Sequence, residues 1–195
     1  MNRLLLFDLG GVLIRNDMFA QLQQLMGTSE SEAVIKSKWL ASPAVRDFEL
    51  GRCTPDQFST SIVEEFQLQT TPAAFLDAFA GWPKGFYAGA PDLLVQLRKK
   101  SPVGCLSNSN ELHWTDQLTS HFDHAYSSHQ LQRIKPDPDV FDFVTTDVGV
   151  KPHQIVFFDD SQPNVDAALA FGWEAHLTVG FSELNQVLRT LGAVQ

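Results

Sequence analysis

The chain has 195 residues, of which 44% are hydrophobic and 19% are charged, a composition typical of a folded domain with room for an insertion and not of a disordered protein. The formal net charge of −9 disfavours binding to nucleic acid or to an anionic membrane surface. Cys53 and Cys105 lie far apart, and no apolar run has the length of a signal peptide or a membrane span, so we expect a cytoplasmic protein with free thiols.

The first apolar run, residues 3–7, predicts a short buried strand that ends at Asp8 and is followed by Gly10 and Gly11. An aspartate at this place either caps the turn through its own side chain or faces a bound ligand. The glycines favour the second interpretation, because they let backbone amides come close to an anion.

Residues 15–87 have helical periodicity throughout, and Thr54-Pro55-Asp56-Gln57 predicts a helix start with a capping box. After this segment, apolar runs at 102–106, 153–158 and 174–179 alternate with amphipathic segments that begin near Ala90, Asp137, Gln162 and Ser182. This alternation predicts an α/β fold with a doubly wound parallel sheet, whose ligands bind at the carboxyl ends of the strands. We expect a sheet domain formed by residues 1–14 and 88–195 and a helical cap formed by residues 15–87.

Three further stretches place polar side chains after predicted strands. Ser107 and Asn108 follow the run at 102–106, where a hydroxyl and a backbone amide can donate to phosphate oxygens. Alternatively, Ser107 forms an ST-turn or caps a helix that begins near Asn110. Lys135 stands before two prolines that stiffen its loop, although an isolated lysine is more often a solvated one.

Asp159 and Asp160 follow the most apolar run of the chain. If Asp8 lies on a neighbouring strand, three carboxylates meet, and their repulsion requires a cation. Oxygen ligands of this kind suit Mg²⁺, which also engages substrate phosphate. The set predicts that Asp8 attacks phosphorus to form an aspartyl phosphate, with Lys135 and Mg²⁺ stabilising the charge and Ser107 orienting the group.

In order, Asp8 in "FDLGGVL", Ser107 in "LSNSN", Lys135 in "KPDP" and Asp159-Asp160 in "FFDDS" resemble the four motifs of the haloacid dehalogenase superfamily. The resemblance spans residues 4 to about 180 and implies a Rossmann-like core with a helical cap inserted after the first motif. It also implies a Mg²⁺ site formed by the Asp8 side chain, the Gly10 carbonyl and Asp160, with Asp159 assisting. The "DLG" motif resembles the branch of sugar-phosphate phosphatases related to the N-terminal domain of epoxide hydrolases.

The sequence departs from this pattern at Gly10, where most phosphatases of the family carry the aspartate that protonates the leaving group. A water molecule, the substrate, or a residue such as His113 or Asp17 must then supply the proton. The expected function is a Mg²⁺-dependent phosphomonoesterase acting on a small phosphorylated metabolite, with sugar phosphates favoured. The alternatives are a 2-haloacid dehalogenase, which the dense negative charge disfavours, and a non-catalytic phospholigand-binding protein, which has no need of Asp8.

Substrate selection is expected to depend on the cap. Its candidate side chains are Trp39, Arg46, Phe48, Phe58 and Trp82, although aromatic residues at helical spacing more often belong to a core.

Overall fold

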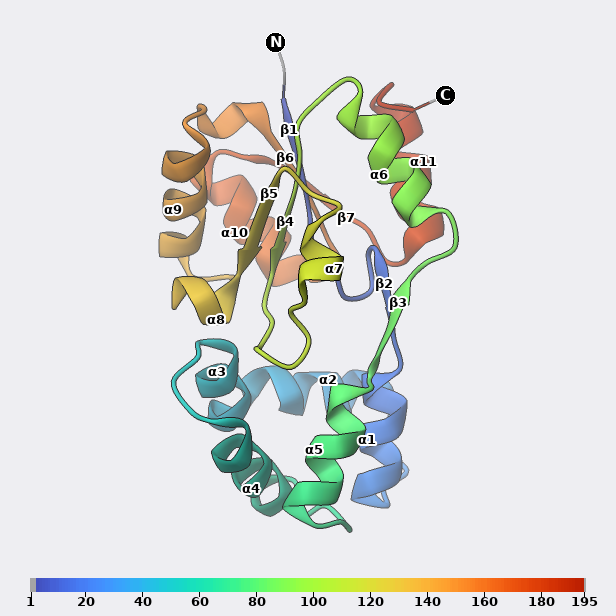
Figure 1. The fold of residues 1–195 in the computed structure, drawn as a ribbon, viewed down its shortest axis with the longest axis vertical. Helices are drawn as coiled ribbons and strands as arrows, with labels where there is room; N and C mark the ends of the chain where they lie inside the picture. Colours follow the sequence, from blue (N-terminus) through green and yellow to red (C-terminus); the bar gives the residue numbers. More distant parts are fainter. Residues whose placement is uncertain (1–2, 195) are drawn as a thin grey trace.

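A computed structural model describes residues 3–194, and its centre is a five-stranded sheet with helices on both faces (Figure 1). The strands of this sheet are β1 (Leu4–Phe7), β4 (Val103–Ser107), β5 (His124–Ser127), β6 (Ile155–Asp159) and β7 (Glu174–Leu177). Their order is β5-β4-β1-β6-β7, and each neighbouring pair is parallel. The predicted α/β, Rossmann-like fold class is confirmed.

The alternation of side chains along β1 explains the two helical layers. Leu5 and Phe7 point into one hydrophobic cluster and Leu4 and Leu6 into another, because successive residues of a strand face opposite sides of a sheet. The first cluster is covered by α6 (Ala90–Arg98) and α11 (Phe181–Thr190), and the second by α9 (Pro138–Val148) and α10 (Gln162–Phe171). The short elements α7 (Asp116–Thr119), α8 (Ser128–Leu131) and the 3-10 helix η1 (Pro152–Gln154) lie in the connections.

Strand β5 was not among the strands that the apolar runs predict. Its sequence is His124-Ala125-Tyr126-Ser127, and it pairs with β4 at the edge of the sheet. An edge strand has one neighbour and keeps its first two residues only half-buried, so it does not need a continuous apolar run. The four strands that were predicted are all present.

Beyond the carboxyl ends of the strands lies a second group of helices, which we call the cap (Figure 1). It consists of α1 (Met18–Met26), α2 (Glu32–Ala41), α3 (Pro43–Glu49), α4 (Pro55–Glu65) and α5 (Pro72–Ala80). Thr54 and Gln57 form the predicted capping box of α4, whereas Thr71 caps α5 through its hydroxyl alone. These signals are local, which is why the sequence locates them.

An antiparallel ribbon connects the cap to the sheet, formed by β2 (Ile14–Asn16) and β3 (Pro83–Phe86). The prediction that residues 15–87 are helical throughout is therefore wrong at both ends of that segment. Strands of three and four residues are too short to show a period of two, and their pairing joins positions about 70 residues apart. The two chain segments that connect the cap to the sheet domain therefore lie side by side.

The cap has its own hydrophobic core, in which Trp39, Phe48, Phe58 and Trp82 are almost fully buried. The rings of Phe48 and Phe58 stack at a centroid distance of 4.2 Å, and Trp39 contacts both Phe58 and Trp82. Their expected role in substrate selection is corrected here, because side chains that fill a core do not face a ligand. Arg46, the fifth candidate, is exposed and reaches the sheet domain.

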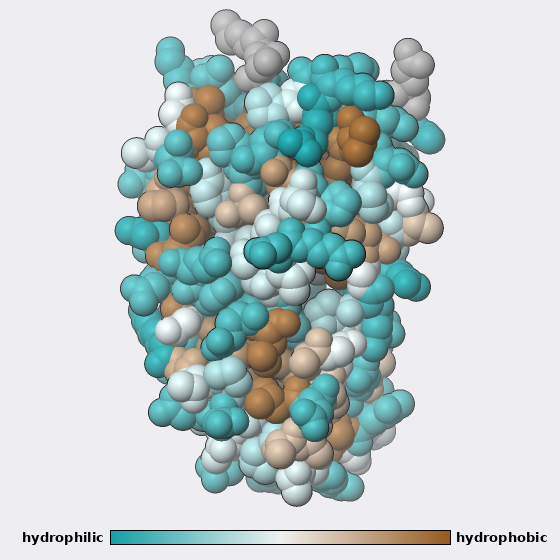
Figure 2. All heavy atoms as spheres, viewed as in Figure 1, coloured by the Kyte–Doolittle hydropathy of each residue, from teal (hydrophilic) through white to brown (hydrophobic). Residues whose placement is uncertain are grey.

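On the face seen in Figure 2, hydrophilic residues cover most of the surface and hydrophobic residues form separate patches. Among residues 3–194, no helix combines the length and the apolar character needed to cross a membrane.

Candidate active site

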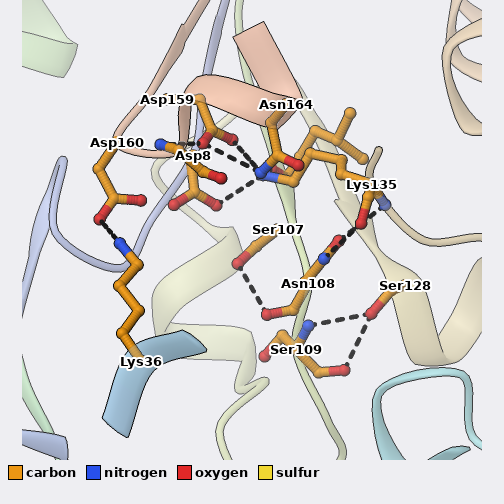
Figure 3. A network of polar contacts seen from close by, with 12 residues as sticks. Asp8, Lys36, Ser107, Asn108, Ser109, Ser128, Lys135, Asp159, Asp160 and Asn164 are labelled. Atoms are coloured by element: carbon orange, nitrogen blue, oxygen red, sulfur yellow. Dashed lines mark hydrogen bonds and ion pairs between the residues drawn. The ribbon is translucent and has the colours of Figure 1, made fainter. Parts of the chain in front are cut away.

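The ends of the three central strands bring the predicted residues together. Strand β1 lies between β4 and β6, so Asp8, Ser107 and Asp159 follow or end neighbouring strands at the same edge of the sheet. Lys135 enters from the loop before α9, and Figure 3 shows it pointing at the carboxylates of Asp8 and Asp159. Residues that are 127 positions apart in the chain thus form one site.

Lys135 is the centre of a buried ion-pair network. Its Nζ donates to Asp8 Oδ1 at 2.8 Å, to Asp159 Oδ2 at 2.6 Å and to the Leu106 carbonyl at 2.8 Å. All three donors of the ammonium are therefore used in fixed directions. Burial alone would lower the pKa of Lys135, but Asp159 and Asp8 outweigh it and hold the pKa above its ordinary value. The lysine is a fixed positive charge beside Asp8.

Asp159 is fully buried and is fully engaged by hydrogen bonds. Besides Lys135, it accepts from the Ser161 backbone N–H at 2.8 Å and from Asn164 Nδ2 at 3.0 and 3.1 Å. Each of its carboxylate oxygens thus has two donors. Asp159 orients the lysine in this structure, and its assistance to a metal ion stays a prediction.

Asp8 lies among negative charges that a cation would compensate. Burial raises the pKa of Asp8 to about 7, with Lys135 opposing the rise and Asp159 and Asp160 adding to it. One oxygen each from Asp8, Asp159 and Asp160 lie within 4.8 Å of one another. Hard oxygen ligands this close, with substrate phosphate and water as further ligands, fit a Mg²⁺ ion.

Asp160 forms the open side of this cluster. Its Oδ2 accepts from Lys36 Nζ of α2 at 2.9 Å, so a cap lysine supplies the positive charge there (Figure 3). The turn after Asp8 packs closely against the same carboxylate. A Cβ added to Gly11, which has φ +76°, would lie 2.9 Å from Asp160 Oδ2, and a side chain is therefore excluded at this position.

Ser107 and Asn108 lie below the carboxylates in Figure 3, and the Asn108 side chain holds the lysine loop. Its Nδ2 donates to the Lys135 carbonyl at 2.9 Å, and its Oδ1 accepts from the Lys135 backbone N–H at 3.0 Å. The Ser107 hydroxyl contacts the Asn108 carbonyl at 3.5 Å, a weak interaction that leaves it able to turn toward a ligand. No helix begins near Asn110 in the described chain, and the alternative that Ser107 caps one is wrong.

The structure separates the candidates for the missing acid. His113 is unsuited, because Nε2 contacts the Phe79 carbonyl at 2.8 Å and Nδ1 contacts Asn110 Nδ2 at 3.2 Å. Burial lowers the pKa of His113, consistent with a neutral ring whose two nitrogens are both in use. Asp17 is exposed at the start of α1. A Cβ at Gly10 would have only Asn16 Nδ2 nearby, at 3.8 Å, so space does not require glycine there.

Several residues of the site have no signal in the sequence. Lys36 is one of three charged residues on α2, and Asn164 lies inside α10. Ser128 Oγ accepts from the Ser109 backbone N–H at 3.0 Å and donates to the Ser109 carbonyl at 3.1 Å, which fixes the loop after β4.

Comparison with known proteins agrees with this geometry. Residues 3–172 match the model of the haloacid dehalogenase-like hydrolases. D-Ribitol-5-phosphate phosphatase of Bacteroides thetaiotaomicron is 26% identical over 199 residues, which cover 96% of this chain and 97% of the relative. Bifunctional epoxide hydrolase 2 of Rattus norvegicus is 33% identical over 108 residues, covering 50% of this chain and 19% of the rat protein.

Among solved structures, a crystal structure of a haloacid dehalogenase family enzyme from Bacteroides thetaiotaomicron contains magnesium and inorganic phosphate. It matches with a TM-score of 0.72 and 27% identity, over 91% of this chain and 94% of the other. The family match covers all four stretches of the site, from Asp8 to Asp160. The chain therefore belongs to the haloacid dehalogenase-like hydrolases.

Proposed function

We propose that this protein is a Mg²⁺-dependent phosphomonoesterase that acts on small phosphorylated metabolites through an aspartyl phosphate on Asp8. The observation that carries the proposal is the placement of Asp8 between a fixed lysine charge and a second carboxylate, Asp160, at the ends of the central strands. Asp8, Asp160 and the backbone carbonyl of Gly10 are the groups we assign to the metal. Bound there, Mg²⁺ supplies positive charge for the phosphoryl oxygens and keeps Asp8 ionised.

In the proposed mechanism, a carboxylate oxygen of Asp8 attacks phosphorus, and the bond to the leaving alcohol breaks. Lys135 stabilises the negative charge on the transferring group, and the Ser107 hydroxyl and the Asn108 backbone N–H orient it. Water then attacks the acyl phosphate, which releases inorganic phosphate and restores Asp8. Asp159 and Asn108 act indirectly, by holding the side chain and the backbone of Lys135.

Sugar phosphates or sugar-alcohol phosphates are the substrate class we favour. The support is the similarity to D-ribitol-5-phosphate phosphatase over nearly the whole length of both chains. A polyol phosphate has an anionic end for Lys135 and hydroxyl groups for the polar residues of the cap. The cytoplasmic location expected from the free cysteines stays a prediction.

Dehalogenation is the weaker alternative. A 2-haloacid carries its own carboxylate, and Asp160 beside the nucleophile would repel it. Displacement of a halide by a carboxylate also needs no metal ion. A purely binding function does not explain why a nucleophilic carboxylate is directed by a buried lysine.

The test is phosphate release from a panel of sugar, sugar-alcohol, alkyl and aryl phosphates with Mg²⁺ and with EDTA. Turnover that requires Mg²⁺ is expected, and beryllium fluoride with Mg²⁺ should form its adduct on Asp8. Asp8→Asn should keep the fold and abolish turnover, because a neutral amide cannot form the acyl phosphate. The matched control is Asp166→Asn on the exposed side of α10, which should retain full activity.

Turnover that is insensitive to EDTA would contradict the proposal, as would chloride release from 2-chloropropionate without phosphatase activity. Activity of Asp8→Asn equal to that of the unmodified protein would contradict the assignment of the nucleophile.

A further inference from the structure

Helix α3 of the cap is held against the sheet domain near the lysine loop. Arg46 on α3 forms an ion pair with Asp137, two residues after Lys135. Just after the helix, Gly51 lies against the backbone of α8, where an added Cβ would be 2.7 Å from the His129 carbonyl. Figure 1 shows α3 beside α8, and the two helices are in contact. The segment between Arg46 and Gly51 therefore lies at the boundary between the cap and the sheet domain, close to the lysine loop.

Glu49 is the acidic residue within this segment. It follows Arg46 by three positions, so the two side chains lie on the same side of the helix, and Arg46 reaches the sheet domain. Glu49 is half-buried, and the charges that act on it are those of Lys135, Asp8 and Arg46. A cap carboxyl thus lies within electrostatic reach of both the nucleophile and the catalytic lysine.

The Glu49 carboxyl has no structural task that explains its position. Within residues 3–194, no side chain or backbone group forms a hydrogen bond or an ion pair with it, although Arg46 is one turn away and pairs with Asp137. Because the Glu49 side chain is only half-buried, its carboxyl keeps contact with solvent at the boundary between cap and sheet, where it can exchange a proton.

The proposed reaction needs a group that gives a proton to the leaving oxygen of the substrate. Gly10 has no side chain, both nitrogens of His113 are in use, and Asp17 is exposed at the start of α1. Lys36 also faces the cluster from the cap, but it pairs with Asp160. Of these candidates Glu49 is left: it lies on the cap side of the boundary near the lysine loop, it has no ion-pair partner in the described chain, and its charge interacts with that of Asp8.

We propose that the protonated carboxyl of Glu49 is the general acid that replaces the side chain missing at Gly10, and this inference rests on the proposed phosphatase function. As Asp8 attacks phosphorus and the phosphorus–oxygen bond breaks, the Glu49 proton moves to the leaving oxygen and an alcohol departs. In the second step, the attacking water gives a proton to the Glu49 carboxylate while its oxygen binds phosphorus. Inorganic phosphate is released, and both carboxyl groups return to their starting states.

The electrostatics of the position suit this task. Burial raises the pKa of Glu49 to about 7, with Lys135 and Arg46 opposing the rise and Asp8 adding to it. Near neutral pH, a large fraction of the molecules therefore carries the proton, as an efficient general acid requires. The rate with substrates that need an acid should fall as the pH rises through this pKa.

The experiment compares Glu49→Gln with the unmodified protein on an alkyl phosphate and on p-nitrophenyl phosphate, with Mg²⁺ present. Glutamine keeps the shape but cannot give up a proton, so kcat for the alkyl phosphate should fall by ~10²-fold or more. The aryl phosphate should react almost as before, because its phenolate leaves without a proton. The alkaline limb of the pH profile for the alkyl phosphate should disappear. Asp47→Asn is the control on the same helix, since Asp47 is exposed and pairs with Arg52.

Each outcome decides between the interpretations. Equal loss of rate with both substrates, or no loss with either, would overturn the assignment of Glu49. If Glu49→Gln fails to fold, the unmodified protein still gives a test, because a steep dependence of kcat on leaving-group pKa would show that no acid is present. If the unmodified protein releases no phosphate from any substrate, the proposed function itself has failed and not the choice of the acid.

Discussion

The sheet domain and the cap differ in whether they bury charged side chains. The buried charged side chains among the described residues are Asp8, Lys135 and Asp159, and all three lie at the end of the sheet. The cap core instead consists of aromatic and aliphatic residues. Charges buried in a rigid network hold their positions but cost desolvation free energy, whereas an apolar core folds without that cost.

The ion pairs between the two halves are of a third kind, beside the part-buried contact of His113 with the Phe79 carbonyl. Lys36–Asp160 and Arg46–Asp137 join cap and sheet through side chains that remain partly exposed. Partly exposed ion pairs contribute little free energy, and exchanging them for substrate or metal contacts is therefore inexpensive. The buried ion-pair network lies wholly within the sheet domain, whereas the ion pairs that join the cap to it are the weaker ones.

The largest expected effect comes from breaking the buried network. Lys135→Met leaves Asp159 buried without its cation and should reduce the free energy of unfolding by ~3–5 kcal/mol. The rate of phosphate release should fall by ~10²-fold or more, because a charge contact with the transferring group is lost. Urea denaturation and steady-state kinetics measure the two effects. A free energy of unfolding equal to that of the unmodified protein would show that Lys135 does not stabilise the buried carboxylates to this extent.

The pH dependence of stability distinguishes the buried acids from the rest. The folded-state pKa values of Asp8 and Glu49 are both about 7, above the ordinary carboxyl range, so the folded state binds more protons than the unfolded state between pH 4 and 7. Their contribution to stability therefore decreases as the pH rises through this window. In EDTA, Asp8→Asn and Glu49→Gln should each gain stability relative to the unmodified protein between pH 5 and pH 8.

Urea midpoints of the three proteins measure this difference. Comparison with the unmodified protein cancels the contributions of His113 and His129, whose lowered pKa values act in the opposite direction. A relative stability that does not change with pH would contradict the raised pKa values.

A smaller effect is expected at the boundary between cap and sheet. Lys36→Met removes a partly exposed ion pair and should change the free energy of unfolding by less than ~1 kcal/mol. Mg²⁺ should bind more tightly, because Lys36 no longer competes for Asp160. Isothermal titration with MgCl₂ measures the affinity. Lys38→Met, on the same helix but paired with Glu30, is the control and should leave Mg²⁺ binding unchanged.

The smallest effect is expected at Gly10. A Cβ fits there, and Gly10→Asp in the otherwise unmodified protein should change the rate little, because Glu49 already supplies the proton. In the Glu49→Gln background, the same substitution should restore part of the lost alkyl phosphatase activity. Plots of log(kcat/KM) against leaving-group pKa for the four proteins measure this. A large gain from Gly10→Asp alone would mean that the site had no acid.

The sequence by itself determined the strand ends and the residues that follow them. Asp8, Ser107 and Asp159 each come directly after a short apolar run, and a buried parallel strand leaves this trace because both of its faces are covered. The capping box at Thr54 is similarly local. Because parallel strands end at one edge of a sheet, the order of these motifs was enough to predict that their side chains meet.

Only the tertiary structure decided the partners of those side chains. That Asp159 holds Lys135, that Asn108 holds the lysine backbone, and that Lys36 reaches Asp160 all depend on segments far apart in the chain. The ribbon of β2 and β3 likewise depends on long-range pairing, and its strands are too short for a periodic signal. A half-buried charged residue such as Glu49 has the same local sequence features as a solvated one on the same helix. The spacing of residues within a helix predicts which side is apolar, but it does not predict which other element packs against a given charged residue.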